Sequence, residues 1–329
     1  MALTRKEKNV VVIGGGTGTS IVLRGLKDYP VNLSAIITTA DTGGSSGVLR
    51  REIGMSPPGD ARQCFVALNG GEHPLIDHFN TRFAGGGLKG HTFGNVFLAL
   101  LWENHDGDFQ QAIEHAESIF DSKHSIIPAT TQPTNLVAHL NTRRKIQGEA
   151  DIIKVKNLSK KLKKLELVPE EEANPKAIKA IKKADYIVIG PGNLFASLTP
   201  PLLVDGIGEA VKKSKAKKIF ILNLMNQNHL YAGYTAKDYI DHFKETLGED
   251  VFDTIIYNTK KIDKKILTDL GIEDDQIKVS PKKHELRFYG ADLVDMRISK
   301  QDPNDPLKRT YIRHDPQKIA DVLFRIINK

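Results

Sequence analysis

The sequence has a single cysteine and no long apolar run, and both shortages restrict its class. Cys64 cannot form an internal disulfide, which favours a reducing compartment. No apolar segment approaches the roughly 20 residues that a membrane-spanning helix needs, and Val10–Ile13 is too short for the core of a secretion signal. We therefore expect a cytoplasmic protein that does not associate with membranes.

Several familiar catalytic and metal-binding motifs are also missing. The eleven histidines lack the H-E-x-x-H spacing, so the sequence predicts no zinc site. No lysine follows the first glycine cluster, which excludes a Walker A loop. Cys64 lies in an apolar helical pattern and is interpreted as a core residue. These patterns assign no catalytic residue.

Positive charge is in excess but is concentrated in a few places. The net charge is +7 and the isoelectric point about 9.2. Few aromatic residues are interleaved with the basic runs, so platforms for stacking nucleobases are missing. We interpret the runs as solvated surface that helps to recruit anionic small molecules, and expect no specific nucleic-acid partner. The runs are Arg143–Lys145, Lys154–Lys156, Lys160–Lys164 and Lys212–Lys218.

Strand patterns followed by glycine-rich loops and helical patterns recur along the chain. This order is typical of a parallel sheet with crossover helices. It predicts one α/β domain over residues 1–329, with a Rossmann-like, doubly wound, mostly parallel sheet. The predicted strands are Asn9–Ile13, Leu33–Thr38, Tyr186–Ile189, Lys218–Leu222, Thr254–Tyr257, Gln276–Val279 and Tyr311–Arg313.

The pattern changes between residues 126 and 168. Short strand-like pieces alternate there with lysine-rich turns, which predicts a β-rich insertion within the domain. Elsewhere, 3.6-residue periodicity and end signals predict helices. These are Thr19–Lys27, Ala61–Leu68 with Asp60 as its N-cap, Phe93–Trp102, Asp108–Ile119, Pro175–Lys183, Pro201–Lys213, Ala236–Leu247 capped by Thr235, Asp263–Leu270 and Asp315–Ile327.

The first glycine-rich loop follows the first strand and opens a helix. In an open parallel sheet, ligands bind beyond the carboxyl ends of the strands, where the strand order reverses. Glycines there let phosphate oxygens approach backbone amides at a helix N-terminus. We predict phosphate binding by Gly14, Gly15, Gly16, Thr17 and Gly18, with a merely tight turn as the alternative. Thr19 replaces the third glycine of the dinucleotide fingerprint, which argues against a dinucleotide enzyme.

A second loop, Ala40–Gly47, follows the second strand. Asp41 stands where a dinucleotide fold holds ribose hydroxyls, and Gly43, Gly44 and Ser45 could form an anion nest. An alternative stays open, in which Asp41 simply caps the turn.

Other loops at the same edge supply the remaining candidates. His91 and Asn95 stand at another helix start, and His91 is either a general acid or phosphate donor, or a polar capping residue. The ligand-binding set is completed by Arg62, Gly190, Gly192, Asn193 and Asn223.

Taken together, these blocks resemble the family that joins the bacterial gluconeogenesis factors (YvcK) to the 2-phospho-L-lactate transferases (CofD). The resemblance extends over nearly the whole chain, and the order and spacing of the blocks make it specific. The blocks are Gly14–Gly18, Ala40–Gly47 with Leu49–Arg50, Pro57–Asp60, Gly90–His91 with Gly94–Asn95, Ala184–Asp185 with Ile189–Gly192, Asn223–Met225 with Gln227, Tyr234–Thr235, and Arg313–Asp315.

The Gly–Gly–Ser–Ser–Gly loop and the terminal Arg–His–Asp are similar to the gluconeogenesis-factor branch. That branch implies a UDP-sugar-binding regulator needed for cell shape and wall precursor supply on gluconeogenic carbon, with no attached turnover. Arg313 matches its ligand-binding arginine, whose fork suits a diphosphate. A regulator implies a controlled metabolic enzyme as partner, and exposed helices of such a sheet allow a homodimer.

The transferase branch implies a second hypothesis, a magnesium-dependent enzyme that uses a nucleotide diphosphate donor. Family members commonly carry a second aspartate after the first in loop two, where this chain has Thr42. The loss of a carboxylate weakens a magnesium site, so no cofactor is firmly implied, and Mg²⁺ is expected only under the transferase hypothesis, held by Asp41. The chain also departs at residues 226–231, where the family reads Thr–Gln–Pro–Gly–Glu–Thr. Residues 260–281 lack the tyrosine that the gluconeogenesis-factor branch places near its ligand.

Overall fold

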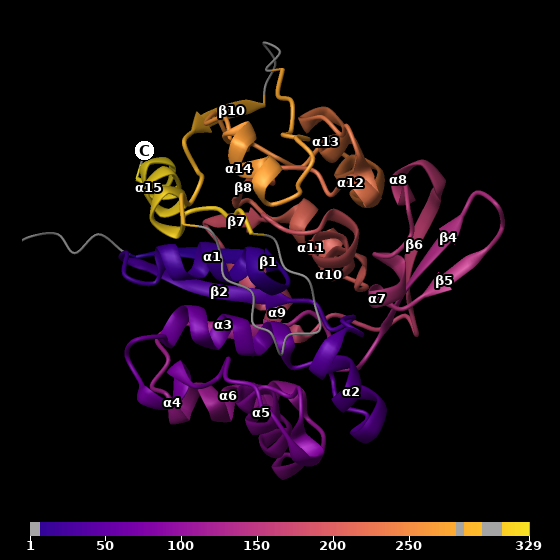
Figure 1. Cartoon of the computed structure of the whole chain (residues 1–329). Helices are drawn as coiled ribbons and strands as arrows, with labels where there is room; N and C mark the ends of the chain where they lie inside the picture. Colours follow the sequence, from indigo (N-terminus) through magenta and orange to yellow (C-terminus); the bar gives the residue numbers. More distant parts are fainter. Residues whose placement is uncertain (1–6, 281–285, 298–310, 329) are drawn as a thin grey trace, which may run out of the picture.

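Seven parallel strands form the central sheet of this protein (Figure 1). The computed structural model describes residues 7–280, 286–297 and 311–328. The strands are β1 (Lys8–Gly14), β2 (Val31–Ile37), β3 (Ser125–Pro128), β7 (Tyr186–Ile189), β8 (Lys217–Ile221), β9 (Thr254–Asn258) and β10 (Arg287–Ala291). They are ordered β10-β9-β8-β7-β1-β2-β3, which confirms the predicted doubly wound α/β class.

Successive residues of the central strands supply two separate cores. Val10 and Val12 of β1 pack into one core, while Val11 and Ile13 pack into the other. This division follows from the two-residue repeat of a strand, and a run that is apolar at every position marks a sheet covered on both faces.

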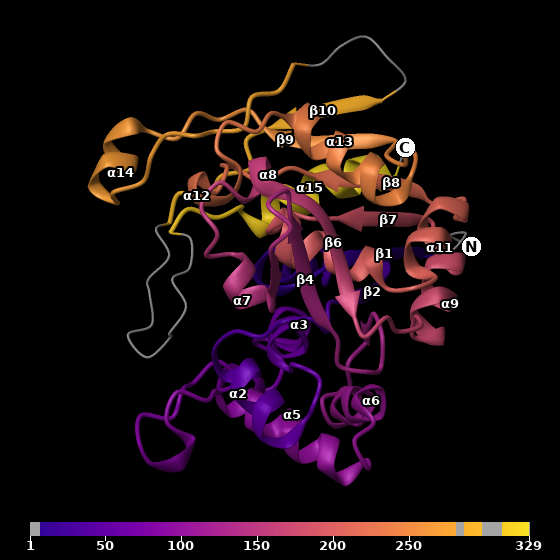
Figure 2. The ribbon, with the colours of Figure 1, turned by 90° about the vertical axis from the view of Figure 1, so that its right-hand side faces the viewer.

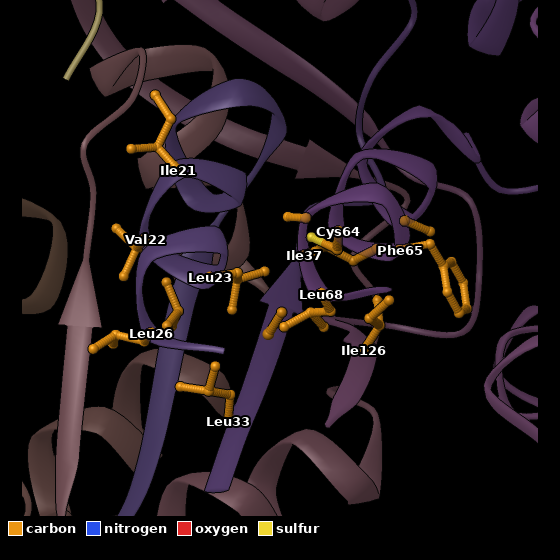
Figure 3. Close-up of a cluster of buried hydrophobic side chains, with 14 of the residues drawn as sticks. Ile21, Val22, Leu23, Leu26, Leu33, Ile37, Cys64, Phe65, Leu68 and Ile126 are labelled. Carbon is orange, nitrogen blue, oxygen red and sulfur yellow. The ribbon is translucent and has the colours of Figure 1, made fainter. Parts of the chain in front are cut away.

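The first core lies under three helices. These are α1 (Gly16–Leu26), α3 (Gly59–Asn69) and α15 (Pro316–Ile327). Helix α5 (Phe93–Asn104) packs against α3, and α6 (Phe109–Ile119) packs against α5 and β3. Figure 3 shows the side chains of α1 and α3 around β2, with Leu23 and Leu68 close to Ile37. Cys64 is buried here, and burial raises its thiol pKa, so it is a core residue as expected.

The second face of the sheet is covered by helices from the later half of the chain. These are α9 (Pro175–Lys183), the π-helical turn η2 (Leu194–Leu198), α10 (Thr199–Leu203), α11 (Ile207–Lys213) and α13 (Ala236–Leu247). A capping box between Thr235 and Asp238 starts α13, as its sequence predicts. The single helix predicted over 201–213 is wrong, because α10 ends at Leu203 and Gly206 breaks the path with a φ of +90°.

A second, three-stranded antiparallel sheet stands beside the main one (Figures 1 and 2). It contains β4 (Asn135–Leu140), β5 (Lys145–Gln147) and β6 (Leu162–Val168), with α7 (Glu149–Ile152) and α8 (Leu158–Lys161) in the connection between β5 and β6. This sheet is the β-rich insertion expected from the sequence. Ile126–Pro128 belong to β3, the edge strand of the main sheet.

Several local predictions are wrong. In place of the predicted strand Gln276–Val279, Gln276 and Lys278 form only isolated bridges. No strand covers 311–313, and the neighbouring His314 forms an isolated bridge to Val294. Asp60 lies in the first turn of α3, and Pro58 is the N-cap. Strand β10 and helix α2 (Gly44–Ile53) were not predicted from the sequence.

The remaining short elements are α4 (Pro74–Asp77), η1 (Gly86–Leu88), α12 (Asn228–Tyr231) and α14 (Lys264–Asp269). In the part of the chain that the structure describes, every helix is too short or too polar to cross a bilayer.

Candidate functional site

The strand order reverses between β1 and β7, which makes their carboxyl ends the expected ligand-binding edge. The chain moves from β1 to β2 and β3 on one side, and from β7 through β8 and β9 to β10 on the other. The loops after β1 and β7 touch there. A Cβ added to Gly18 would lie 1.8 Å from the carbonyl oxygen of Pro191. The structure therefore brings Gly14–Gly18 and Gly190–Asn193 together.

The glycine turn after β1 also meets a carboxylate. Gly15 is the N-cap of α1 and offers no side chain to its amides. A Cβ on Gly15 would lie 2.4 Å from Oδ2 of Asp60, which is 8% exposed, and Thr17 donates a hydrogen bond to Gln63 (3.1 Å). Asp60 is thus a wall of this turn, a role that its sequence pattern does not reveal because that pattern predicts a cap.

Helix α2 begins inside the second loop, at Gly44, although the glycines of this loop predict no helix there. The Asp41 carboxylate accepts a hydrogen bond from the amide of Gly43 at 2.7 Å, which is the turn-capping geometry. Gly44 has a φ of +48° and begins α2, and Ser46 accepts a hydrogen bond from the Gly59 amide at 3.0 Å. The capping contact of Asp41 leaves its second oxygen near α3, 3.5 Å from the position of a Cβ on Gly59.

A third carboxyl group, Glu149 of the insertion, faces the same loops. Burial raises the pKa of Glu149 to about 8, and the charges of Asp41 and Asp60 add to the rise. Burial also lowers the pKa of Arg50 in α2, and the charge of Asp41 opposes this decrease. Glu149 is therefore harder to ionise than an ordinary glutamate. No pattern near residue 149 could have revealed this contact.

These carboxyl groups do not form a ready metal site. Within the described residues, no group of three or more His, Cys, Asp or Glu side chains is arranged to hold a metal ion. Thr42, which replaces a family aspartate, is engaged elsewhere, since its hydroxyl accepts a hydrogen bond from the Ala150 amide at 3.1 Å.

Four predicted residues meet in one buried hydrogen-bond network. The Arg62 Nε donates to the Oδ1 of Asn95 at 2.9 Å, and the Nδ2 of Asn95 donates to the Oγ of Ser45 at 2.9 Å. Ser45 also contacts the Nδ1 of His91 at 3.0 Å, and the Arg62 guanidinium reaches the side chain of Asn80. All four of the predicted residues are at most 9% exposed. The network joins α2, α3 and α5 beneath the second loop.

The sequence 43–47 also fits the G-x-S-x-G pattern of nucleophilic serines, a match that raises the question of catalysis. A nucleophilic serine of that class stands on a strained turn between strand and helix. Ser45 instead is the second residue of α2, and its φ is not positive. The backbone therefore does not support a nucleophile elbow.

On the other side of the switch point, Asn223 ties the loop after β8 to the loop after β7. It accepts a hydrogen bond from the Gly192 amide at 2.9 Å and donates one to the Gly192 carbonyl at 2.7 Å. Asn193 donates to Gln227 at 2.7 Å and caps the turn that follows. Asn223, Gly192 and Asn193 therefore form one rigid corner.

A cavity of about 490 Å³ opens beside this corner, beyond the carboxyl ends of β8 and β9. Its lining includes Asn223, Tyr257 and Asn258, together with four lysines, Lys260, Lys261, Lys264 and Lys278. Another cavity, of about 420 Å³, lies at the amino ends of β1 and β2, around Lys27 and His124. Parallel sheets bind ligands at the carboxyl edge, so the first cavity belongs to the candidate site.

The C-terminal block brings Arg313 to the same edge. His314 is buried and its Nε2 donates to the carbonyl of Leu222, which directly follows β8 (3.1 Å). Burial lowers the pKa of His314 to about 4, so it is neutral. The Arg313 carbonyl accepts from the Asp295 amide at 2.9 Å. The backbone of Arg313 is therefore fixed next to the end of β8.

Comparisons with known proteins agree over nearly the full length. The family described as 2-phospho-L-lactate transferase CofD matches residues 10–298. Gluconeogenesis factors from Halalkalibacterium halodurans and Bacillus subtilis are 37% and 36% identical. They cover 97% and 98% of this chain and 96% and 99% of their own lengths, respectively. A crystal structure of a UPF0052-family protein from Bacillus halodurans superposes with a TM-score of 0.86. It is 35% identical, and the match covers 97% of this chain and 99% of that one.

Proposed function

Because this chain belongs to the 2-phospho-L-lactate transferase family and has relatives named gluconeogenesis factors, we propose that it is a regulator that binds a UDP-sugar. It acts in the cytoplasm on a metabolic enzyme, in support of cell shape and wall precursor supply on gluconeogenic carbon. The observation that carries the proposal is the convergence of Gly14–Gly18, Gly190–Asn193 and Asn223 at the β1/β7 switch point, beside the 490 Å³ cavity.

The charges indicate how such a ligand lies. Asp60 borders the glycine turn at Gly15, so we assign the phosphates to the later amides of the turn, Gly16–Gly18, and to the corner after β7. The lysines that line the cavity supply positive charge for a diphosphate. We assign the guanidinium of Arg313 to the same role. Carboxylates accept hydrogen bonds from sugar hydroxyls. We therefore assign the hydroxyls of the ribose and the hexose to Asp41 and the neighbouring Asp60.

Calorimetric titration of the protein with UDP-N-acetylglucosamine tests this proposal. We expect saturable binding, and a loss of at least about tenfold in affinity in Arg313→Ala, because one charge-assisted contact contributes about 1.5–3 kcal/mol. Arg325→Ala removes an exposed arginine of α15 and is the matched control. It should change the affinity by less than about twofold. Absence of binding by the unaltered protein would overturn the proposal.

A second candidate function is favoured by the carboxyl cluster. The charges of Asp41 and Asp60 both act on Glu149, and a pair of carboxylates attracts a divalent cation with a bound diphosphate. The alternative is a magnesium-dependent transferase of the 2-phospho-L-lactate type that uses a nucleotide diphosphate donor. Phosphorus NMR of GDP- and UDP-linked donors with the protein and Mg²⁺ tests it. Unchanged donor resonances over prolonged incubation would exclude it.

A further inference from the structure

The connection between β5 and β6 contacts loops on both sides of the switch point. At its start, the Ala150 amide donates to the Thr42 hydroxyl in the loop after β2 (3.1 Å). A Cβ on Gly148 would lie 3.3 Å from the same hydroxyl oxygen, so this turn is packed closely against Thr42. The connection is thereby fixed to the β2 side of the sheet.

The far end of the connection is fixed to the β8 side. Helix α8 packs against α12, which lies in the loop after β8, as Figure 1 shows. Leu158 of α8 is fully buried in the second core, and the side chain of Ser159 opposes the rise that burial gives the pKa of Tyr234. β7 and β1 lie between β8 and β2 in the sheet. A segment fixed to both loops therefore passes the carboxyl ends of β1 and β7.

The backbone of this segment has turn points at both ends. Gly148 has a φ of +94°, and Asn157, just before α8, has a φ of +54°. Left-handed backbone is uncommon outside glycine, and asparagine adopts it more readily than most residues. Between the two points, Lys154 and Lys156 are exposed; Lys154 pairs with Asp151, and Lys156 supplies positive charge to the segment.

We propose that residues 148–161 form a strap across the nucleotide site that closes on the bound ligand, with Thr42 as the positioning residue that fixes its first turn. This inference rests on the proposed function. The insertion thereby makes one wall of the site. The cations of the strap suit the diphosphate of a nucleotide sugar, and the strap retards the ligand's release.

Hydrogen exchange and binding kinetics test the strap. Peptides within 148–161 should exchange more slowly when UDP-N-acetylglucosamine is bound. Thr42→Val keeps the shape of the side chain and removes the hydroxyl, and it should raise the dissociation rate by about tenfold with the association rate unchanged, since retention acts on dissociation. Thr42→Ser keeps the hydroxyl and should restore the slow release.

Tyr234→Phe removes the phenol hydroxyl whose pKa responds to Ser159 at the other end, and it provides an independent variant if Thr42→Val folds poorly. It should also speed dissociation. The outcomes separate the two proposals. If the unaltered protein does not bind the nucleotide sugar, the proposed function fails. If it binds while exchange in 148–161 stays constant and both variants release ligand at the original rate, the strap is refuted and the function stands.

Discussion

At the scale of single residues, two glycines of the first turn are required by their neighbours. Gly18 faces the carbonyl of Pro191, and Gly15 faces Asp60 and Thr38. The sequence explains these glycines by the close approach of a phosphate. The structure adds a second reason, because a side chain at either position would collide with neighbouring residues even when no ligand is bound. Both reasons apply to one turn, because a tight β1–β7 contact also determines where the free amides of α1 point.

We therefore predict that Gly18→Ala destabilises the fold. The added methyl group would overlap the Pro191 backbone, which cannot rotate away as a side chain can. Overpacking of this kind costs about 1–3 kcal/mol. Gly87→Ala is the control, because nothing lies within 4 Å of its added Cβ. Urea unfolding followed by circular dichroism measures both variants, and equal midpoints for Gly18→Ala and the unaltered protein would contradict the prediction.

At the scale of elements, the helices and strands with a clear hydrophobic pattern are the ones that the sequence predicts. The continuous apolar run of β1 and the amphipathic pattern of α15 are predicted from the sequence, and the structure shows that Asp315 is the N-cap of α15. Helix α2 was missed because Gly-Gly-Ser-Ser-Gly has low helix propensity, and a tertiary hydrogen bond from Gly59 to Ser46 holds its start. Strand β10 was missed because it is only half-buried and contains Gly290, so its pattern does not alternate.

In the candidate site too, some residues can be predicted from the sequence and others cannot. The glycine loops could be predicted because parallel strands bring their carboxyl ends to one edge. Asp60 and Glu149 could not, because their proximity to Asp41 is created by folding. Thr42 and Ala150 are 108 residues apart in the chain, and no local pattern relates them.

The junction of α6 and β3 yields a prediction about pH. Glu117 near the end of α6 accepts a hydrogen bond from the Ile126 amide at 2.5 Å, and burial raises its pKa to about 7. An unfolded glutamate titrates near 4.5. The folded state thus binds the proton more tightly, and the stability that this supplies is present below about pH 4.5 and lost as the pH rises through 7.

Glu117→Gln should therefore raise the melting temperature relative to the unaltered protein at pH 8 and lose this advantage at pH 5. Scanning calorimetry at both pH values measures the difference. Glu103→Gln, which alters an exposed carboxylate near the end of α5, is the control and should show no such pH dependence. A constant difference across pH for Glu117→Gln would show that the group is not protonated in the fold.

At the scale of the whole molecule, most of the excess positive charge lies in the insertion. Residues 141–168 contain nine lysine or arginine and three acidic residues, a net charge of +6 against +7 for the full chain. Asp151 pairs with Lys154, and Glu166 pairs with Lys164 and His139. The insertion therefore creates a basic flank beside the candidate site, and the rest of the molecule is close to neutral.

This distribution predicts weak, sequence-independent attraction to polyanions that salt removes. Binding to a duplex DNA of arbitrary sequence should be measurable near 50 mM salt and fall by at least about a hundredfold near 200 mM, because it depends on counterion release. Replacing Lys160, Lys161 and Lys163 by glutamine should weaken this binding and reduce its salt slope by about 0.9 for each phosphate that the protein no longer neutralises. Replacing Lys212, Lys213 and Lys215, from the other basic run, is the matched control and should have a smaller effect. Fluorescence anisotropy measures all three proteins, and binding that resists salt and prefers one sequence would identify the insertion as a specific nucleic-acid surface.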